Sequence, residues 1–130
     1  MVSDPIGDLL TRIRNAQERQ HDDITLPSTK MLVSLAGILK KEGFINDYSV
    51  IENEVQNELN ITLKYVNGVP AIRELVRISK PGIRKYVGYR SIKPIKNGLG
   101  VAIFSTPIGI ISGDDAKKQK IGGEYICYVS

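Results

Sequence analysis

The chain has 130 residues, of which 42% are hydrophobic and 25% charged, and it carries a formal net charge of +4. This size and composition fit one globular domain, or two small lobes, with a packed core. The sequence contains no apolar run approaching the roughly 20 residues of a membrane helix, no signal-peptide pattern at its start, and only one cysteine, Cys127, which excludes an internal disulfide and a cysteine-based zinc site. We therefore expect a cytosolic protein.

The first half of the chain is predicted to fold in the order helix, strand, helix, strand, strand. The first helix has Asp4 as its N-cap and Pro5 at its first position, and its apolar stripe comprises Ile6, Leu9, Leu10, Ile13 and Ala16. The second helix is expected to begin at Ser28 or Thr29 and to end at Gly43. The expected strands cover residues 24–26, 44–51 and 59–65, and a polar loop joins the last two.

The second half is predicted to be mainly β. Strands are expected over residues 72–79, 84–89, 99–105, 110–111 and 124–129, with one helical turn over 91–96 and a small helix over 114–120. Asn97-Gly98 indicates a hairpin before the strand at 99–105. The fold class is therefore α+β, with an α-β-α-β-β N-terminal lobe at residues 1–66 and a mostly antiparallel C-terminal lobe with one short helix at residues 67–130.

Basic residues gather in the second half. Residues 1–65 hold seven Lys or Arg against ten Asp or Glu, whereas residues 66–130 hold eleven against four. Eight of these basic residues lie between positions 73 and 96, with Tyr86 and Tyr89 interleaved. Arg and Lys contact phosphates and tyrosines stack on bases. Charge alone leaves open whether the run binds a polyanion or is a solvated face, and for either tyrosine alone a core position is the favoured interpretation.

Two short segments of the second half are candidates for contact with a ligand. Ser105-Thr106-Pro107-Ile108-Gly109 follows an apolar strand, and its hydroxyls beside a glycine can reach base edges, 2′-hydroxyls or phosphates. The alternative is a turn whose hydroxyls cap the local backbone. The second segment, Gly122-Gly123-Glu124, is likewise either a turn or a place where an RNA backbone comes close.

Signatures of catalysis are missing from the sequence. It holds no GxxxxGK phosphate loop, GxSxG elbow or HExxH motif. The only histidine, His21, adjoins two aspartates, and a polar loop explains this group better than a metal site. We expect Cys127 in the core or at the edge of the last strand rather than as a nucleophile. No catalytic residue, metal site or cofactor is predicted.

A metal-dependent hydrolase or nuclease is the weakest of the functional alternatives. Its carboxylates would have to come from Asp4, Asp8, Asp22 or Asp23. Two of these, Asp4 and Asp8, already serve the positive end of the first predicted helix.

Several blocks of residues, in order along the chain, resemble the bacterial-type small-subunit ribosomal protein S-eight family. The blocks are residues 4–16, 27–30, 42–45, 78–82 with Arg84 and Tyr86, 98–103, Ser105-Thr106 with Gly109, and 122–129. They cover essentially the full length of the chain. Their order and separation make the resemblance specific, whereas no single block would.

The resemblance implies a two-lobe, non-catalytic protein that needs no cofactor. Such a protein binds a helical stem in the central domain of small-subunit ribosomal RNA, supports early assembly, and has other small-subunit ribosomal proteins as neighbours in the cytoplasm. The family's bacterial members also repress their own operon by binding a messenger segment, so the alternative function is a translational repressor that acts mainly off the ribosome. The two are distinguished by sedimentation with or apart from ribosomal particles.

The resemblance also implies where RNA binds. The family's RNA surface carries over to the Ser-Thr loop of the second lobe, and the adjoining basic run supplies a phosphate contact. The expected RNA-binding residues are Ser105, Thr106, Pro107, Gly109, Tyr86, Lys85, Gly122, Gly123 and Glu124, with Ser28, Thr29 and Lys30 of the first lobe.

The central loop departs from the family pattern at two positions. Where the family has a further serine and then a polar or basic residue, this chain has Pro107 and Ile108. The change removes one hydroxyl, one backbone N–H and a charge, while the fixed φ of proline pre-orders the loop. The departure bears on affinity, and the location of the site is expected to persist.

Overall fold

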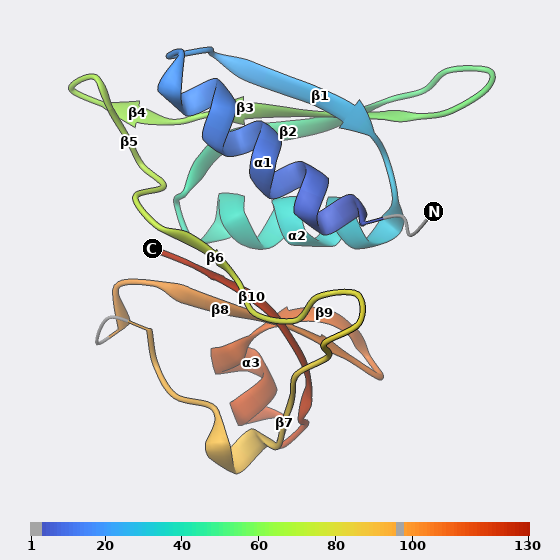
Figure 1. Cartoon of the computed structure of the whole chain (residues 1–130), viewed down its shortest axis with the longest axis vertical. Coiled ribbons are helices and arrows are strands. Elements are labelled where there is room, and N and C mark those ends of the chain that lie inside the picture. Colours follow the sequence, from blue (N-terminus) through green and yellow to red (C-terminus); the bar gives the residue numbers. More distant parts are fainter. Residues whose placement is uncertain (1–3, 96–97) are drawn as a thin grey trace. The chain divides into compact units, whose positions relative to one another are not determined.

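The computed structural model describes residues 4–95 and 98–130 and divides into two compact units, residues 4–72 and 73–130 (Figure 1). Both units combine helix with antiparallel strands, which confirms the predicted α+β class. Over the described residues, none of the helices has the length and apolarity needed to cross a bilayer.

The predicted boundary between the lobes lies after residue 66, whereas the contacts of the chain place residues 67–72 with the first unit. Two hydrogen bonds explain the difference. The Ala71 N–H donates to Lys64 O (2.9 Å), and Gln17 Nε2 donates to Ile72 O (3.3 Å). These bonds tie the segment after the Asn67-Gly68 turn back to the first helix and to the strand region before the turn.

The first unit follows the predicted order, with a small hairpin added at its end. Its elements are α1 (Pro5–Glu18), β1 (Asp23–Pro27), α2 (Lys30–Lys41), β2 (Ile45–Ile51), β3 (Glu58–Leu63), β4 (Tyr65–Val66) and β5 (Val69–Pro70).

Side-chain caps fix the start of both helices of the first unit. Asp4 Oδ1 accepts a hydrogen bond from the Gly7 N–H (3.2 Å), and Thr29 Oγ1 accepts one from the Leu32 N–H (3.1 Å). Each cap satisfies one of the N–H groups that a helix leaves unpaired at its first turn. The structure therefore selects Thr29, rather than Ser28, as the N-cap of α2.

The sheet of the first unit has the order β1-β3-β2, with β3 in the centre. Leu59, Ile61 and Leu63 of β3 are buried, whereas the alternating residues of the strand are partly exposed. Because side chains alternate between the faces of a sheet, one face is the core, covered by α1 and α2 (Figure 1), and the other face carries neither helix.

The second unit is built around its last strand. Its elements are β6 (Leu75–Arg77), β7 (Tyr86–Val87), the 3₁₀ turn η1 (Tyr89–Ser91), β8 (Val101–Thr106), β9 (Gly109–Ser112), α3 (Gly113–Lys118) and β10 (Gly123–Val129). The strand order is β6-β10-β8-β9, and β7 also pairs with β10. All these pairings are antiparallel, as expected.

Helix α3 covers one face of this sheet. Ala102 and Phe104 of β8 pack with Ala116 of α3 and with Ile92 in a buried cluster. The ring of Tyr125 stacks on that of Phe104 with centroids 4.6 Å apart. Ser112 caps α3 by accepting a hydrogen bond from the Asp115 N–H (3.2 Å), so the helix begins just before the range predicted for it.

Some elements of the second unit are shorter than predicted or lie elsewhere. Strand β6 ends at Arg77 because the Ile78 and Ser79 N–H groups both donate to one carbonyl, Ile126 O, so the ladder stops there. The helical turn expected over 91–96 is η1, which begins at Tyr89. Lys96 and Asn97 lie outside the described residues, and with them part of the predicted Asn97-Gly98 turn. Strand β8, which follows, pairs with β9 and β10 and not with the strand before the turn.

Cys127 lies fully buried in β10, as predicted. Burial raises the pKa of its thiol to about 12, because the thiolate cannot be solvated there. The folded-state pKa then exceeds the ordinary value of 9.0, so the stability contributed by the neutral thiol is complete below about pH 9 and is lost as the pH rises toward 12.

We expect the folded protein to resist a thiol reagent at pH 8 and to react once per chain after unfolding in denaturant. The physical reason is the scarcity of thiolate and the lack of access to Cys127. The measurement is the labelling rate followed by mass spectrometry. Reaction of the folded protein at the rate of a free cysteine peptide would contradict the burial.

Candidate nucleic-acid interface

A row of side chains crosses the sheet of the second unit from β7 to β9. Tyr86 pairs with Glu124, Glu124 pairs with Ser105, and Ser105 pairs with Ile110. Residues directly opposite in antiparallel strands place their side chains on the same face. Because Phe104, next to Ser105, points into the α3 core, this row lies on the face away from α3.

The two tyrosines of the basic run lie in different environments. Tyr86 is 73% exposed, so the core position favoured for it from sequence is wrong. Tyr89 is only partly exposed and packs against the α3 cluster, so for Tyr89 the same interpretation is confirmed. The sequence could not separate them because both are flanked by basic residues.

Ser105 and Thr106 differ in the use of their hydroxyls. Thr106 Oγ1 donates to Gly109 O (2.8 Å) and accepts from the Ile108 N–H (3.3 Å), so its hydroxyl closes the turn. Ser105 Oγ has no hydrogen-bond partner in the described part of the chain and is partly exposed. Local capping, one of the two alternatives for this loop, therefore holds for Thr106, whereas the Ser105 hydroxyl caps nothing among the described residues.

The turn between β8 and β9 consists of Pro107 and Ile108, both exposed. Proline at the first central position excludes the primed turns that usually close two-residue hairpins, because those need a positive φ there. The twist of an unprimed turn does not match the twist of the two strands. Gly109, directly after the turn, has φ +118°, a conformation open to glycine that lets the strands pair despite this difference. The loop is therefore ordered by its own covalent geometry, and it presents the apolar side chain of Ile108.

Gly122 and Gly123 are required by the chain's own packing. A Cβ on Gly123 would lie 2.3 Å from Ser105 O, and one on Gly122 would lie 2.6 Å from Val87 O. Both contacts are with backbone atoms of neighbouring strands, which cannot move aside as a flexible side chain can. Glycine at these two positions allows β10 to lie against β7 and β8.

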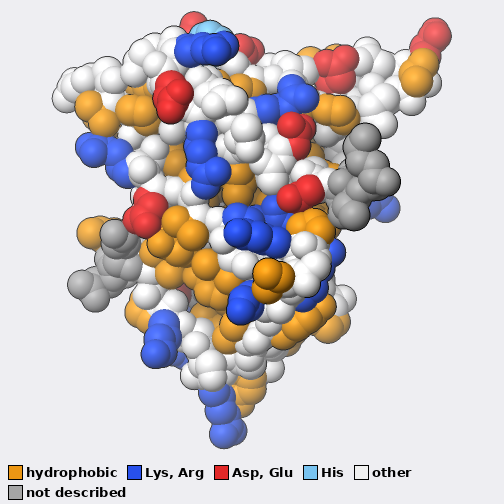
Figure 2. All heavy atoms as spheres, in the orientation of Figure 1, with side chains coloured by type: hydrophobic (Ala, Val, Ile, Leu, Met, Phe, Trp, Pro, Cys, Tyr) orange, Lys and Arg blue, Asp and Glu red, His pale blue; other side chains and the backbone are white. Residues whose placement is uncertain are grey.

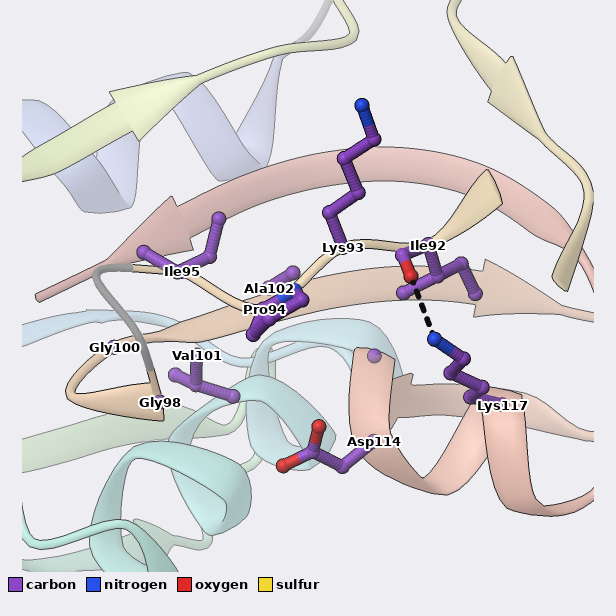
Figure 3. Close-up of a pocket in the computed structure, with 11 residues that line it drawn as sticks. Ile92, Lys93, Pro94, Ile95, Gly98, Gly100, Val101, Ala102, Asp114 and Lys117 are labelled. Atoms are coloured by element: carbon purple, nitrogen blue, oxygen red, sulfur yellow. Dashed lines mark hydrogen bonds between the residues drawn. The ribbon is translucent and has the colours of Figure 1, made fainter. Parts of the chain in front are cut away.

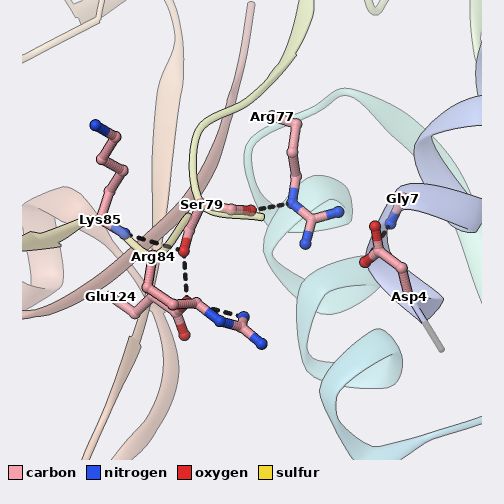
Figure 4. A network of polar contacts seen from close by, with 7 residues as sticks. All are labelled: Asp4, Gly7, Arg77, Ser79, Arg84, Lys85 and Glu124. Atoms are coloured by element: carbon pink, nitrogen blue, oxygen red, sulfur yellow. Dashed lines mark hydrogen bonds and ion pairs between the residues drawn. The ribbon is translucent and has the colours of Figure 1, made fainter. Parts of the chain in front are cut away.

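Glu124 is the centre of a polar network that holds the segment before β7 onto β10 (Figure 4). Its Oε2 accepts hydrogen bonds from Ser79 Oγ and from Arg84 Nη1, the latter at 3.0 Å. Ser79 is fully buried and its Oγ also accepts from the Lys85 N–H (3.2 Å). Glu124 is thus a positioning residue in this structure: its carboxylate is committed to the protein's own donors.

The segment that this network holds carries two further cations. Lys80 and Ile83 exchange two backbone hydrogen bonds of 2.9 and 3.0 Å across the Pro81-Gly82 turn. Lys80 and Lys85 are exposed, and neither side chain has an ion-pair partner within the described segments. The second unit thus combines unpaired positive charge before β7, the exposed ring of Tyr86 and, across β10, the hydroxyl of Ser105, which are groups that can contact a polyanion, a base or a sugar.

Three further candidates are Ser28, Thr29 and Lys30. They belong to the first unit, whereas the polar row belongs to the second. They line a groove together with the loop at residues 53–57. The hydroxyl of Thr29 is used as the N-cap of α2, so the exposed ammonium of Lys30 is the principal free group of the three.

A small, mostly apolar pocket lies elsewhere in the second unit, between α3, β8 and residues 92–95 (Figure 3). Lys117 Nζ donates to Ile92 O (3.3 Å) at its rim. Over residues 4–95 and 98–130, no three His, Cys, Asp or Glu side chains are grouped so as to hold a metal ion.

Sequence reasoning missed the roles of Ser79 and Arg84. Both belong to a recognised block of residues, but the partner of each is Glu124, at least 40 positions away in the chain. No local pattern marks such a contact.

Comparison with known proteins gives a consistent result. A family model described as Ribosomal protein S8 matches residues 4–130. A protein of Paraburkholderia phymatum described as small ribosomal subunit protein uS8 is 50% identical over 129 residues, covering 99% of this chain and 98% of the relative. Proteins of the same description from Paraburkholderia xenovorans and Burkholderia cenocepacia match with the same identity and coverage.

We expect Gly123→Ala to lower the free energy of unfolding by about 1–3 kcal/mol, the usual cost of inserting a methyl group into a closed site. The physical reason is the backbone oxygen of Ser105 in the space of the new Cβ. Gly88→Ala is the matched control, because a Cβ there meets nothing within 4 Å and the backbone φ of −73° suits alanine. The measurement is urea unfolding followed by circular dichroism, and equal stability of the two variants would contradict the close approach.

Proposed function

Because the chain belongs to the ribosomal protein S8 family of the small subunit, we propose that it binds the central domain of small-subunit ribosomal RNA and supports assembly of the subunit in the cytoplasm. The protein is a structural component of the ribosome and not an enzyme. The binding surface of the proposal is the polar row of the second unit with its flanking cations.

The observation that carries the proposal is the free hydroxyl of Ser105 on the same face of the sheet as the exposed ring of Tyr86, in a unit whose segment before β7 carries two unpaired lysines. A hydroxyl fixed on a strand makes directional hydrogen bonds, whereas lysines supply attraction without direction. This combination suits a ligand with both a definite shape and many phosphates. RNA with an irregular stem has both properties, because its bulged or non-paired bases are open to side chains that the deep groove of regular A-form duplex excludes.

The residues of the proposed site divide by role. Ser105, Tyr86, Lys80, Lys85 and Ile108 are the proposed contacts, because each has an exposed or free group. The roles proposed for the remaining second-unit residues are to shape the surface: Thr106, Pro107 and Gly109 through the turn, and Gly122, Gly123 and Glu124 through the position of β10. Ser28 and Lys30 remain proposed as secondary contacts of the first unit.

The proposal is tested by filter binding with the irregular central-domain stem and with a fully paired duplex of equal length. We expect the protein to prefer the stem. Ser105→Ala should weaken stem binding by about 1–3 kcal/mol, because the RNA group that pairs with the Ser105 hydroxyl is left without a partner. Binding of the duplex should be unchanged. Ser49→Ala is the control, since Ser49 is an exposed strand serine of the first unit. Equal binding of stem and duplex by the unaltered protein would refute specific recognition.

Lys85→Ala is expected to lower affinity for stem and duplex alike. The reason is that Lys85 is exposed and contributes charge rather than direction, so its loss removes about one released counterion. The measurement is the slope of log affinity against log salt, which should become shallower by about 0.7–0.9. A loss confined to the stem would instead assign Lys85 to base or bulge recognition.

A further inference from the structure

The part of the first unit between α2 and the end of β3 has a charge opposite to that of the protein as a whole. Residues 42–63 contain five carboxylates and no Lys, Arg or His, although the whole chain has a net charge of +4. Glu52 and Glu54, in the loop between β2 and β3, have no ion-pair or hydrogen-bond partner within residues 4–95 and 98–130. A surface of this sign repels a phosphate backbone and attracts cations.

The same loop exposes apolar side chains. Val55 is 98% exposed, and Val50 and Ile51 at the end of β2 are each more than 40% exposed. In Figure 1 the hairpin formed by β2 and β3 extends beyond the sheet, and in Figure 2 its end carries acidic and hydrophobic side chains. Apolar side chains gathered at an exposed projection are typical of a contact surface.

The loop is held in one conformation by its own hydrogen bonds. Asn53 Nδ2 donates to Glu58 Oε1 (2.7 Å), and the Asn53 N–H donates to Asn57 Oδ1 (3.3 Å). Two further bonds join it to the segment before α2: the Ser28 N–H donates to Asn57 O (2.9 Å), and Gln56 Nε2 donates to Ser28 O (3.2 Å). A loop ordered in advance loses little conformational entropy when it binds.

A groove lies beside the hairpin, between it and the start of α2. Val33 and Val50 contribute its apolar part, and Glu54 and Val55 lie on its hairpin side. The apolar wall fits the aliphatic stem of a lysine or arginine, and the carboxylate fits the charged end. Lys30, at the start of α2, is the single cation among the lining residues and Glu54, on the hairpin, the single anion, so the hairpin side of the groove is the acidic one.

Among residues 4–95 and 98–130, no strand pairs with the outer edge of β2, which therefore ends the sheet on that side. Asp47 Oδ1 accepts from the Tyr48 N–H (2.8 Å) and from Lys40 Nζ (2.9 Å), so the edge is occupied at that point and Asp47 is already neutralised. The hydrogen bond from Lys40 lowers the pKa of Asp47, which keeps this carboxylate charged and paired. Beyond Tyr48 the edge leads directly to Val50 and the acidic loop.

We propose that residues 50–55, the docking hairpin, bind an extended Lys- and Arg-rich segment of a neighbouring protein of the small subunit. Aliphatic parts of that segment pack on Val50, Ile51 and Val55, and its charged ends pair with Glu52 and Glu54. The inference rests on the proposed place of the chain in the small subunit. It assigns opposite partners to the two units: RNA to the basic second unit and a basic protein to the acidic hairpin of the first.

Photo-crosslinking in reconstituted small subunits tests the proposal. Because Cys127 is buried, a cysteine introduced by Val55→Cys is the reactive thiol to which a benzophenone maleimide attaches. We expect the label to crosslink to a ribosomal protein, through a peptide with an excess of Lys and Arg. Crosslinking to RNA alone, to a peptide without that excess, or to nothing would overturn the proposal.

Ile108→Cys, labelled in the same way, separates this inference from the proposed function. The label at position 108 is expected to crosslink to ribosomal RNA. Failure at 108 with success at 55 would leave the docking hairpin in place and remove the proposed RNA site, whereas the reverse result would remove the docking hairpin alone.

Charge reversal tests the chemistry of the occupant. Glu52→Lys with Glu54→Lys, added to the Val55→Cys protein, should reduce the crosslink yield about tenfold, because both ion pairs become repulsions. Glu18→Lys is the matched control, since Glu18 is an exposed acid at the end of α1, and its yield should be unchanged. An undiminished yield in the double variant would overturn the assignment of a basic segment.

Discussion

The second unit depends on how closely β10 approaches its neighbours at Gly122 and Gly123. A side chain at either position would meet a backbone oxygen of β7 or β8 at well under 3 Å. Without side chains there, β10 pairs with β6, β7 and β8, and it brings Glu124 between Tyr86 and Ser105. The same strand supplies Ile126 O, which receives the Ile78 and Ser79 N–H groups and so anchors the segment that carries the cations.

The proposed contact surface is consequently a product of long-range packing rather than of one motif. The Ser79–Glu124–Arg84 network joins a loop to a strand that follows it by some 40 residues. Because Ser79 is fully buried, its hydroxyl cannot exchange these partners for water, and the position of the loop follows from the position of β10. Stiffness beneath an exposed row of polar groups favours recognition of shape over general attraction to charge.

How far the sequence predicted this structure depended on whether the signal was local. The caps at Asp4 and Thr29, the apolar stripe of α1 and the two-lobe α+β class rest on short-range patterns, and the structure agrees with them. Tyr86 and Tyr89 share a local context but differ in burial, because only the second meets the α3 cluster. The same limit applies at position 123. Glycine is required there because Ser105 O, on the neighbouring strand, occupies the space of a Cβ.

Thr106 shows how a turn can set the polarity of whatever approaches it. A threonine hydroxyl has one proton to donate and two lone pairs to accept with. In this structure the proton is directed to Gly109 O and one lone pair to the Ile108 N–H, which leaves a single acceptor position. Any group that reaches Thr106 Oγ1 without opening the turn must therefore be a donor: an amino group or a ribose hydroxyl meets this condition, and a phosphate oxygen does not.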